Sequence, residues 1–365
     1  ISLTLPDGRT YDFGGDYPGA HADLHILDVK AIQAFVQKGD IGFAESYRDG
    51  LWTSSDLSNL FLFGLQNEKV LDRYIYGSFL GRIASRFAYI FTRNTVKGSQ
   101  KNIHAHYDLG NEFYRLWLDP SMTYSSAIYE NDNDDLTRAQ YRKYDRITER
   151  LSSSGRLLEV GCGWGGYADR ALEKKDFGIK GITISQQQYD YAKDRLQSKA
   201  DICLEDYRHQ EGKYENIVSI EMFEAVGESF WPTYFSKLKS LLHERGKAII
   251  QTITIDDSYF ERYRKGGDMI RTYIFPGGML PSWERFQEAS QKVELKVSDK
   301  FAFGKDYAKT LEAWLERFDD KIEEVRALGF DQKFIRIWRF YLACCIASFK
   351  VERTNVMQIE LQHAA

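Results

Sequence analysis

The sequence predicts an α/β protein in which a doubly wound parallel sheet follows a smaller, mainly helical domain. Segments typical of strands and helices alternate from about residue 105 onward, as they do in parallel α/β sheets. A glycine-rich turn joins the first of these strands to the first helix, and residues 1–98 follow a different pattern. With 365 residues, the chain is long enough for two domains.

Residues 1–98 are predicted to form a helical domain that docks on lipid. The segment LTLPDGRTYDFGG is typical of two strands joined by a Pro-Asp-Gly turn. Helical periodicity follows in LHILDVKAIQAFVQKG and again from Asp56 onward. The polar connector TRNTVKGSQKN, residues 92–102, ends this unit, and residues 99–365 are expected to form the second domain.

The second domain is predicted to alternate five strands with helices. The strands are expected at GRLLEVG, KGITIS, ADICLED, NIVSIEMF and KAIIQTITI, and the helices at YADRALEKK, QQQYDYAKDRLQSK and SFWPTYFSKLKSLLH. An insertion over residues 256–290 and a helical tail over residues 305–350 complete the chain.

Charge and cysteine content bear on the class of protein and its compartment. The net charge of −4 gives no indication of nucleic-acid binding. Four cysteines form no disulfide framework and favour a reduced setting. The longest apolar run, residues 340–349, is far shorter than the ~20 residues that span a bilayer, and no signal peptide is visible. We therefore expect a cytoplasmic protein that associates with the membrane transiently.

The segment from residue 70 to residue 102 combines positive charge with aromatic side chains. It holds six basic residues against one acid, Asp72. Such a stretch is typical of a peripheral membrane surface, although a packed helix with a solvated basic edge has the same composition. The basic residues are Arg73, Arg82, Arg86, Arg93, Lys97 and Lys101.

The turn after the first predicted strand indicates a cofactor bound at a helix N-terminus. Gly161, Gly163 and Gly166 satisfy the pattern G-x-G-x-x-G. A nicotinamide cofactor would need a carboxylate about 20 residues later, where the sequence has Thr183 and no acid. Glu159 would repel a pyrophosphate, whereas it would attract a cationic sulfonium with a free amino group. Charge therefore favours S-adenosylmethionine.

Several motifs occur in the order found in one enzyme family. They are AHYDLGNEFYRLWLDPSMTYSSA, EVGCGWGG, ITIS-x-x-Q, EDYR, EMFEAVG and YIFPGGMLPS, with GFAESYRDGLW in the first domain. In this set the chain resembles the cyclopropane fatty acid synthases and the mycolic acid cyclopropane synthases over nearly its whole length. The resemblance implies a Rossmann-like class I methyltransferase domain. It also implies S-adenosylmethionine-dependent transfer of a methyl(ene) group to the double bond of unsaturated phospholipid acyl chains in the membrane surface, forming cyclopropane fatty acids.

The resemblance also implies which residues hold S-adenosylmethionine. Thr183 and Gln188 would supply ribose contacts in place of the missing carboxylate, and Asp206 would meet the adenine edge. Gln188 could instead be an exposed helix residue. The full predicted set is Tyr124, Ser125, Glu159, Gly161, Gly163, Thr183, Ile184, Gln188, Asp206 and Tyr207.

The chemistry of alkene methylation sets further requirements. An isolated alkene is a weak nucleophile, and its methylation leaves a carbocation that must lose a proton. The site therefore needs to exclude water, to present aromatic faces to the positive charge, and to place a base nearby. The family that this chain resembles uses bound bicarbonate as the base, held by Cys, Glu, His and Tyr side chains and a backbone contact. The matching residues here are Ser126 in the place of Cys, Glu224, Gln251 in the place of His, Tyr307 and the backbone of Ile253.

These replacements leave two products open. Ser126 and Gln251 still donate hydrogen bonds to an oxyanion, so bicarbonate binding and a cyclopropane product are expected. An altered base would instead give a methylidene or methyl-branched chain. Glu224 could also cap the helix near Ser229, and Tyr307 could be an ordinary packing residue.

Functions of other kinds also stay open. The chain could be a non-catalytic relative that binds lipid, which cofactor binding would separate from an enzyme. It could also methylate a small soluble acceptor, which turnover without lipid would reveal; the apolar segment around Phe275 favours an acyl chain. No metal is expected, because His104 and His106 have no third ligand at usable spacing. A homodimer is expected from the resemblance alone.

Overall fold

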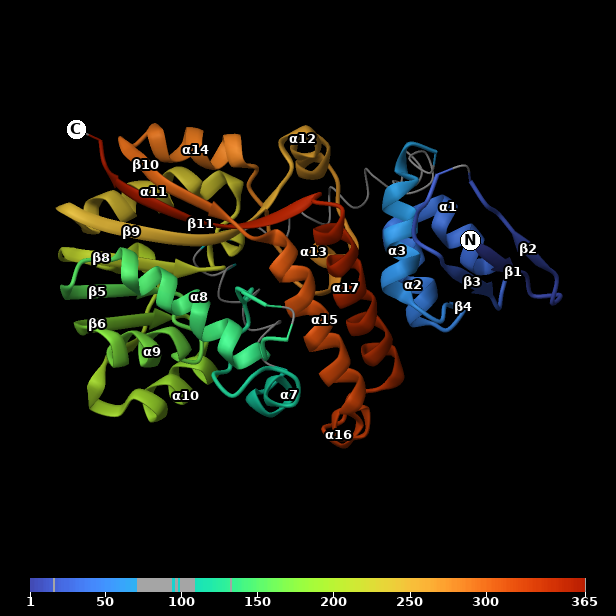
Figure 1. The fold of residues 1–365 in the computed structure, drawn as a ribbon, viewed down its shortest axis with the longest axis horizontal. Coiled ribbons are helices and arrows are strands. Elements are labelled where there is room, and N and C mark those ends of the chain that lie inside the picture. Colours follow the sequence, from blue (N-terminus) through green and yellow to red (C-terminus); the bar gives the residue numbers. More distant parts are fainter. Residues whose placement is uncertain (16, 71–93, 96–97, 99–108, 132, 365) are drawn as a thin grey trace.

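The computed structural model describes residues 1–365 except 16, 71–93, 96–97, 99–108, 132 and 365. In Figure 1, the large sheet and the helices that cover it lie on the left, and a smaller N-terminal unit lies on the right. Two long helices, α15 (Gly304–Asp320) and α17 (Gln332–Lys350), lie between them. The short helix α16 (Ile322–Ala327) connects these two.

The large sheet has seven strands in the order β10-β11-β9-β8-β5-β6-β7. Strands β5 to β9 run parallel to one another, and the chain reverses its direction of winding after β7. The predicted doubly wound, Rossmann-like fold is therefore confirmed. The strands are β5 (Ser154–Val160), β6 (Asp176–Thr183), β7 (Asp201–Leu204), β8 (Tyr214–Ile220), β9 (Leu242–Ile255), β10 (Leu295–Ala302) and β11 (Thr354–His363).

Two of these strands, β10 and β11, had no counterpart among the predicted elements. Strand β11 lies between β9 and β10 and is antiparallel to both. It buries Gln358 and Glu360, which are polar residues that hydrophobic patterning does not place inside a sheet. Strand β10 is at the sheet edge, where its side chains alternate between partly buried and exposed.

Helices cover both faces of the sheet, which explains why its central strands are apolar throughout. Leu157 of β5 packs with residues of α8, α9 and α10, whereas its neighbour Leu158 packs on the opposite face with residues of α11 and α14. These helices are α8 (Leu136–Arg150), α9 (Gly166–Lys174), α10 (Gln186–Leu196), α11 (Trp231–Leu241) and α14 (Trp283–Gln291). Helices α12 (Asp257–Lys265) and α13 (Met269–Tyr273) form the insertion, and α7 (Asn111–Arg115) precedes α8.

The N-terminal unit contains more sheet than the sequence predicted. Its four strands have the order β2-β1-β3-β4, of which only the β1–β2 hairpin was expected. The expected helix from Leu24 is wrong in its first turn, because Ile26 is buried in β3 while Leu27 is exposed. The elements are β1 (Ser2–Thr4), β2 (Thr10–Asp12), β3 (Asp23–Ile26), β4 (Trp52–Thr53), α1 (Lys30–Lys38), α2 (Asp40–Arg48) and α3 (Leu57–Gln66).

The N-terminal unit is joined to α17 by aromatic packing and hydrogen bonds. The ring of Phe340 contacts those of Phe43 and Phe61, with centroids 6.1 Å and 4.6 Å away. The guanidinium of Arg336 donates to the backbone oxygens of Tyr47 and Trp52. The two parts of the chain therefore share one hydrophobic core.

Some predictions fall on residues outside the described part. They concern most of the basic, aromatic stretch, the boundary near residue 98, and His104 and His106. In the part that is described, no helix has both the length and the apolar character needed to cross a bilayer. Within the same part, no three His, Cys, Asp or Glu side chains gather as a metal site would require.

Candidate functional site

A pocket lies at the carboxyl ends of β5, β6, β7 and β8, the edge at which open α/β sheets bind ligands. All of the residues predicted to hold S-adenosylmethionine line this pocket. Their contact with the cofactor stays a prediction. The lining residues include Tyr124, Ser125, Glu159, Gly161, Gly163, Thr183, Ile184, Gln188, Asp206, Tyr207, Arg208 and Glu221.

The glycine-rich turn between β5 and α9 has the backbone of a ligand-binding loop. Gly161, Gly163 and Gly165 all have positive φ angles, of 82°, 52° and 81°. Residues that carry a side chain rarely adopt such angles. A Cβ atom on Gly161 would come within 2.8 Å of the Met222 side chain, whereas a Cβ on Gly163 would meet open space. The turn is therefore tightly packed at Gly161 and open at Gly163.

Glu159 gives this pocket a buried, incompletely paired carboxyl group. The residue is only 2% exposed, and no described residue forms a hydrogen bond with its Oε2 atom. Burial raises the pKa of Glu159 well above its ordinary value, while the positive charge of Lys143 opposes that shift. A cationic ligand fits this group, because its charge favours the ionised form of the acid. The ammonium group of S-adenosylmethionine would also donate hydrogen bonds, and its sulfonium would add positive charge.

The segment after β6 presents polar groups where a ribose would lie. The Thr183 hydroxyl donates a 2.9 Å hydrogen bond to Oε1 of Gln188. Gln188 is 6% exposed and lines the pocket, so it is not an exposed helix residue. The Ser185 hydroxyl caps α10 by accepting from the backbone N–H of Gln188. Ile184 adds an apolar contact beside these groups.

Asp206 and Tyr207 follow β7 on the other side of the pocket. Asp206 accepts two side-chain hydrogen bonds from Arg208, of 2.8 Å and 2.6 Å. This ion pair lowers the pKa of Asp206 against the effect of burial, so the carboxylate is charged. Burial raises the pKa of Tyr207 to about 12, which keeps its hydroxyl neutral and able to donate. An adenine amino group would share Asp206 with Arg208.

A second polar cluster adjoins this pocket, and its centre is Glu221. Oε1 of Glu221 accepts hydrogen bonds of 2.8 Å from the backbone N–H of Ser126 and from Nε2 of Gln251. Oε2 accepts a 2.6 Å hydrogen bond from the hydroxyl of Tyr307. Three residues predicted to hold bicarbonate are thus brought together, but around a glutamate that the sequence analysis did not select.

Glu221 could have been found from its place in the sequence. It directly follows β8, at the carboxyl edge of the sheet where ligand-binding side chains gather. The EMFEAVG motif holds two acids, and only the second, Glu224, was assigned a role. Glu221 also has a φ angle of 49°, a conformation that is uncommon for residues other than glycine and concentrates at functional sites.

Glu224 lies beside this cluster and bonds to a different group. Its Oε1 accepts from the backbone N–H of Ile253, and no described residue pairs with its buried Oε2. The carboxylate oxygen with a partner therefore bonds to β9, not to the helix near Ser229. Burial, and next the charge of Glu221, raise the pKa of Glu224 to about 8. Of two adjacent carboxylates, only one ionises readily, so Glu224 carries the proton at neutral pH.

A hydrogen-bond chain fixes the orientation of Gln251. Nε2 of Gln358 donates to Oε1 of Gln251 over 3.0 Å, which leaves the Gln251 amide N–H directed at Glu221. Nη1 of Arg146 donates in turn to Oε1 of Gln358 over 2.6 Å. Arg146 also pairs with Asp299.

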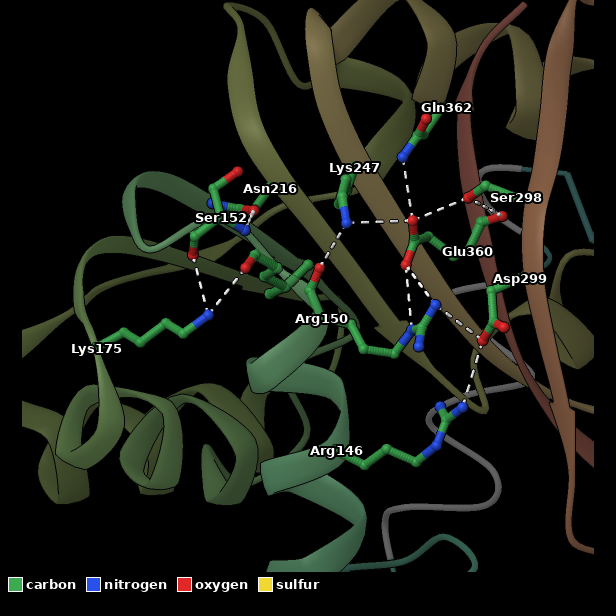
Figure 2. Close-up of polar contacts among 11 residues, drawn as sticks. Arg146, Arg150, Ser152, Lys175, Asn216, Lys247, Ser298, Asp299, Glu360 and Gln362 are labelled. Carbon is green, nitrogen blue, oxygen red and sulfur yellow. Dashed lines mark hydrogen bonds and ion pairs between the residues drawn. The ribbon is translucent and has the colours of Figure 1, made fainter.

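Figure 2 shows the ion pairs that hold this side of the sheet to α8. The buried carboxylate of Glu360 pairs with Arg150 at 3.1 Å and with Lys247 at 3.3 Å. Arg150 also reaches Asp299 at 3.1 Å. The network therefore fixes α8, which carries Arg146, against β10 and β11.

Lys143 of α8 is a fully buried cation next to the site. It is 0% exposed, and its Nζ donates to the hydroxyl of Ser125. Burial lowers the pKa of Lys143 to about 7, although the charges of Glu221, Asp119 and Glu159 act in the opposite direction. Among these buried groups, Lys143 thus offsets part of the negative charge.

Aromatic rings pack around Tyr307 and Tyr124, beside the cluster. The Tyr307 ring packs on Phe349, with centroids 4.6 Å apart, and meets Trp314 at 6.0 Å. The Tyr124 ring lies 5.3 Å from Trp314 and 6.3 Å from Phe275 of the insertion. These faces can stabilise a cation and exclude water.

Comparisons with known proteins agree with this geometry. A sequence profile of the family described as "Mycolic acid cyclopropane synthetase" matches residues 94–359. The tuberculostearic acid methyltransferase of Mycobacterium tuberculosis is 34% identical over 88% of this chain and 78% of its own. The cyclopropane-fatty-acyl-phospholipid synthase of Escherichia coli is 33% identical over 93% of this chain and 87% of its own.

Solved structures give the same result. A mycolic acid cyclopropane synthase, crystallised with S-adenosylhomocysteine and CTAB, superposes with a TM-score of 0.67. It is 32% identical, and the match covers 72% of this chain and 98% of the other. The profile match and the two relatives each span most of the chain. The chain therefore belongs to the mycolic acid cyclopropane synthetase family and is an S-adenosylmethionine-dependent methyltransferase of the cyclopropane synthase type.

Proposed function

We propose that the protein transfers a methyl(ene) group to the double bond of unsaturated acyl chains of phospholipids, forming cyclopropane fatty acids. The observation that carries this proposal is the continuity between two parts of the site. Glu221 and Tyr124 line the cofactor pocket, and the same two residues belong to the carboxylate and aromatic clusters beside it.

The cofactor contacts are proposed from the lining of the pocket. When bound, S-adenosylmethionine supplies an electrophilic methyl group on a cationic sulfur. Glu159 attracts its positive charge, and the turn at Gly161 and Gly163 lets the backbone approach it. Thr183 and Gln188 bind the ribose hydroxyls, while Asp206 and Tyr207 contact the adenine. Tyr124, Ser125 and Ile184 complete the set.

The acyl chain is proposed to lie against the aromatic rings. Tyr124, Phe275, Trp314 and Tyr307 give apolar faces that exclude water and stabilise positive charge as it develops on the alkene. The hydroxyl of Tyr307 donates to Glu221, which fixes the orientation of the ring.

Bicarbonate as the base follows from the resemblance, but its proposed holders are already engaged. Ser126, Gln251 and Tyr307 donate to Glu221, and the backbone N–H of Ile253 donates to Glu224. Bicarbonate would have to displace one of these carboxylates, so the donor set does not fit it as a free ligand. We therefore derive no step through bicarbonate.

A methyl-branched or methylidene product is the second candidate. It is favoured by the likeness to the tuberculostearic acid methyltransferase, which is named for methyl transfer. It is also favoured by the different residues that stand in the base pocket, Ser126 and Gln251. Both products need the same cofactor and the same unsaturated chain.

The setting of the reaction is part of the proposal. An acyl chain of a phospholipid is reached at a membrane surface, so the protein would be cytoplasmic and bind that surface transiently. The basic, aromatic stretch around residues 70–102 has the composition for this contact. A homodimer is proposed on the resemblance to the family.

The proposal is tested by mass spectrometry of membrane lipids from cells that express the chain and are fed methyl-deuterated methionine. Monounsaturated phospholipid chains are expected to gain one labelled carbon, and vector-only cells serve as the control. No labelled lipid from a protein that binds S-adenosylmethionine would refute the lipid acceptor. No cofactor binding at all would refute the catalytic function.

A further inference from the structure

We propose that the carboxylate of Glu221 is the general base of this enzyme, built into the chain at the place where a separate bicarbonate ion would otherwise bind. The inference rests on the proposed function for the nature of the substrate. It rests on the hydrogen bonds around Glu221 for the identity of the base.

The donors around Glu221 match the anion that they hold. A carboxylate and a bicarbonate ion present the same pair of oxygen atoms on one carbon. The donors around Glu221 satisfy both of its oxygens, with Ser126 and Gln251 on Oε1 and Tyr307 on Oε2. The family resemblance assigns the side chains of Gln251 and Tyr307 to bicarbonate, whereas Ser126 contributes its backbone N–H to Glu221 and directs its hydroxyl to the carbonyl of Ala127. These donors hold one anion, and that anion is the carboxylate of Glu221.

Glu221 also has the right position for a base, beside the cofactor pocket. Glu221 lines the same pocket as Gly161, Gly163 and Tyr124, so it adjoins the space proposed for the cofactor. Glu224 is directed elsewhere, because its carboxylate bonds to the backbone of Ile253. Of the two acids in the motif, Glu221 is therefore the one that can reach the reacting carbon.

The backbone of Glu221 has a conformation that is uncommon for glutamate. Glu221 has a φ angle of 49°, and its N–H donates a 2.7 Å hydrogen bond to the carbonyl of Gln251. Glycine would adopt this conformation with less strain. The hydrogen bonds around Glu221 hold the residue in this strained conformation, with its carboxylate among the donors.

In the proposed reaction, methyl transfer is followed by the loss of one proton to Glu221. The electron pair of the alkene forms a bond to the methyl carbon while the carbon–sulfur bonding pair leaves with sulfur, and the acyl chain carries one positive charge. A C–H bond of the added carbon then breaks, and its electron pair closes the three-membered ring. The proton passes to Glu221, which becomes neutral and returns its proton to water after the product leaves.

Three variants separate this proposal from a structural role. Glu221→Gln keeps the shape and removes the base. Glu221→Gly suits the backbone and opens the space for bicarbonate. Glu294→Gly is the matched control, because Glu294 also has a positive φ, of 58°, and lies exposed on the surface. Each protein is assayed on vesicles of a monounsaturated phospholipid in CO₂-free buffer, with and without added bicarbonate. Binding of ¹³C-bicarbonate is followed separately by NMR.

Wild-type protein and E294G are expected to turn over lipid without bicarbonate and to show no bicarbonate binding. E221Q is expected to lose on the order of 10²–10⁴-fold in rate while still binding S-adenosylmethionine. E221G is expected to bind ¹³C-bicarbonate and to regain activity when it is added.

Bicarbonate binding by the wild-type protein, or near-wild-type turnover by E221Q, would overturn the proposal. If the wild-type protein binds cofactor but modifies no lipid, the proposed function has failed. The comparison of bicarbonate binding by wild type and E221G then still decides whether Glu221 fills that place.

Discussion

The hydroxyl of Tyr307 donates a 2.6 Å hydrogen bond to the carboxylate of Glu221, joining the first turn of α15 to the end of β8. The contact links the aromatic wall, to which the Tyr307 ring belongs, with the polar centre of the site. A hydrogen bond to the ionised form of an acid favours that form. Tyr307 therefore both orients Glu221 and helps to keep it ionised, against burial, which raises the pKa of Glu221.

Replacing Tyr307 with Phe is expected to shift the pH dependence of catalysis. Loss of the hydroxyl removes a bond that lowers the pKa of Glu221, so this pKa rises. Because the base must be ionised, the acidic limb of the rate profile is expected to move to higher pH. The measurement is the rate at saturating S-adenosylmethionine across a pH series.

A matched control for Y307F is Tyr214→Phe. Tyr214 is also buried, and its hydroxyl donates to Gln210 in a different core. This variant is expected to keep the wild-type pH profile. An unshifted profile for Y307F, or an equal shift for both variants, would show that Tyr307 has no direct effect on the base.

Replacing Glu159 with Gln is expected to weaken the binding of S-adenosylmethionine. The variant keeps the shape of the side chain but cannot ionise when the cationic ligand binds. We expect a loss of about tenfold or more in affinity, which corresponds to about 1.4 kcal/mol or more. Isothermal titration calorimetry measures the Kd directly.

Glu205→Gln provides the comparison for E159Q. Glu205 lines the same pocket but pairs with Lys180 at 3.5 Å, so its charge is already compensated. The variant is expected to bind S-adenosylmethionine nearly as the wild type does. Equal losses in the two variants would mean that Glu159 is not a specific contact for the cation.

The cofactor side of the site was well predicted from the sequence, and the reason is local. Gly161 and Gly163 belong to one strand–turn–helix unit, and Thr183 and Gln188 belong to the next. The parallel sheet brings the ends of its strands together, so these short motifs define one pocket. The contact of each residue with the cofactor stays a prediction.

The role of Glu221 was missed because it depends on contacts that are distant in the chain. Its donors come from Ser126, Gln251 and Tyr307, which lie on three separate segments. Gln251 itself is oriented by Gln358 of β11, a strand that the sequence did not indicate. Because β11 buries polar residues, its hydrophobic pattern does not indicate a strand. One of these residues, Gln358, donates the hydrogen bond that orients Gln251.

Glu224 predicts a pH dependence of stability. Its pKa is raised to about 8 in the folded protein, from an ordinary value of 4.5. The folded state then binds the proton more tightly than the unfolded state between these two values. Stability from this group is therefore complete below about pH 4.5 and is lost as the pH rises toward about 8.

Glu224→Gln is expected to remove this dependence, because glutamine stays neutral. Between pH 6 and pH 8, the free energy of unfolding of the wild type is expected to fall relative to E224Q by about 1 kcal/mol per pH unit. Urea denaturation at several pH values measures the difference. Parallel curves for the two proteins would contradict the raised pKa.

Replacing Glu360 with Ala is expected to destabilise the fold. The change leaves Arg150 and Lys247 without their buried partner, as Figure 2 makes clear. Because both cations are about one third exposed, water can solvate them in part, and we expect a loss of about 1–3 kcal/mol in the free energy of unfolding.

The comparison for E360A is Asp299→Ala, in the same network. Asp299 is 33% exposed, so its ion pairs are expected to contribute less than about 1 kcal/mol. Chemical denaturation of both variants gives the two values. A larger loss for D299A than for E360A would show that burial does not decide the strength of this network.

The central claim is that one site binds S-adenosylmethionine and delivers a carbon from it to an unsaturated acyl chain, with Glu221 removing a proton. The most direct measurement incubates the purified protein with methyl-deuterated S-adenosylmethionine and vesicles of a monounsaturated phospholipid, in CO₂-free buffer. Mass spectrometry then counts the deuterium atoms on each added carbon, and saturated phospholipid serves as the control. We predict two deuterium atoms and a product that co-elutes with a cyclopropane standard. Three deuterium atoms, or no labelled chain, would contradict the account.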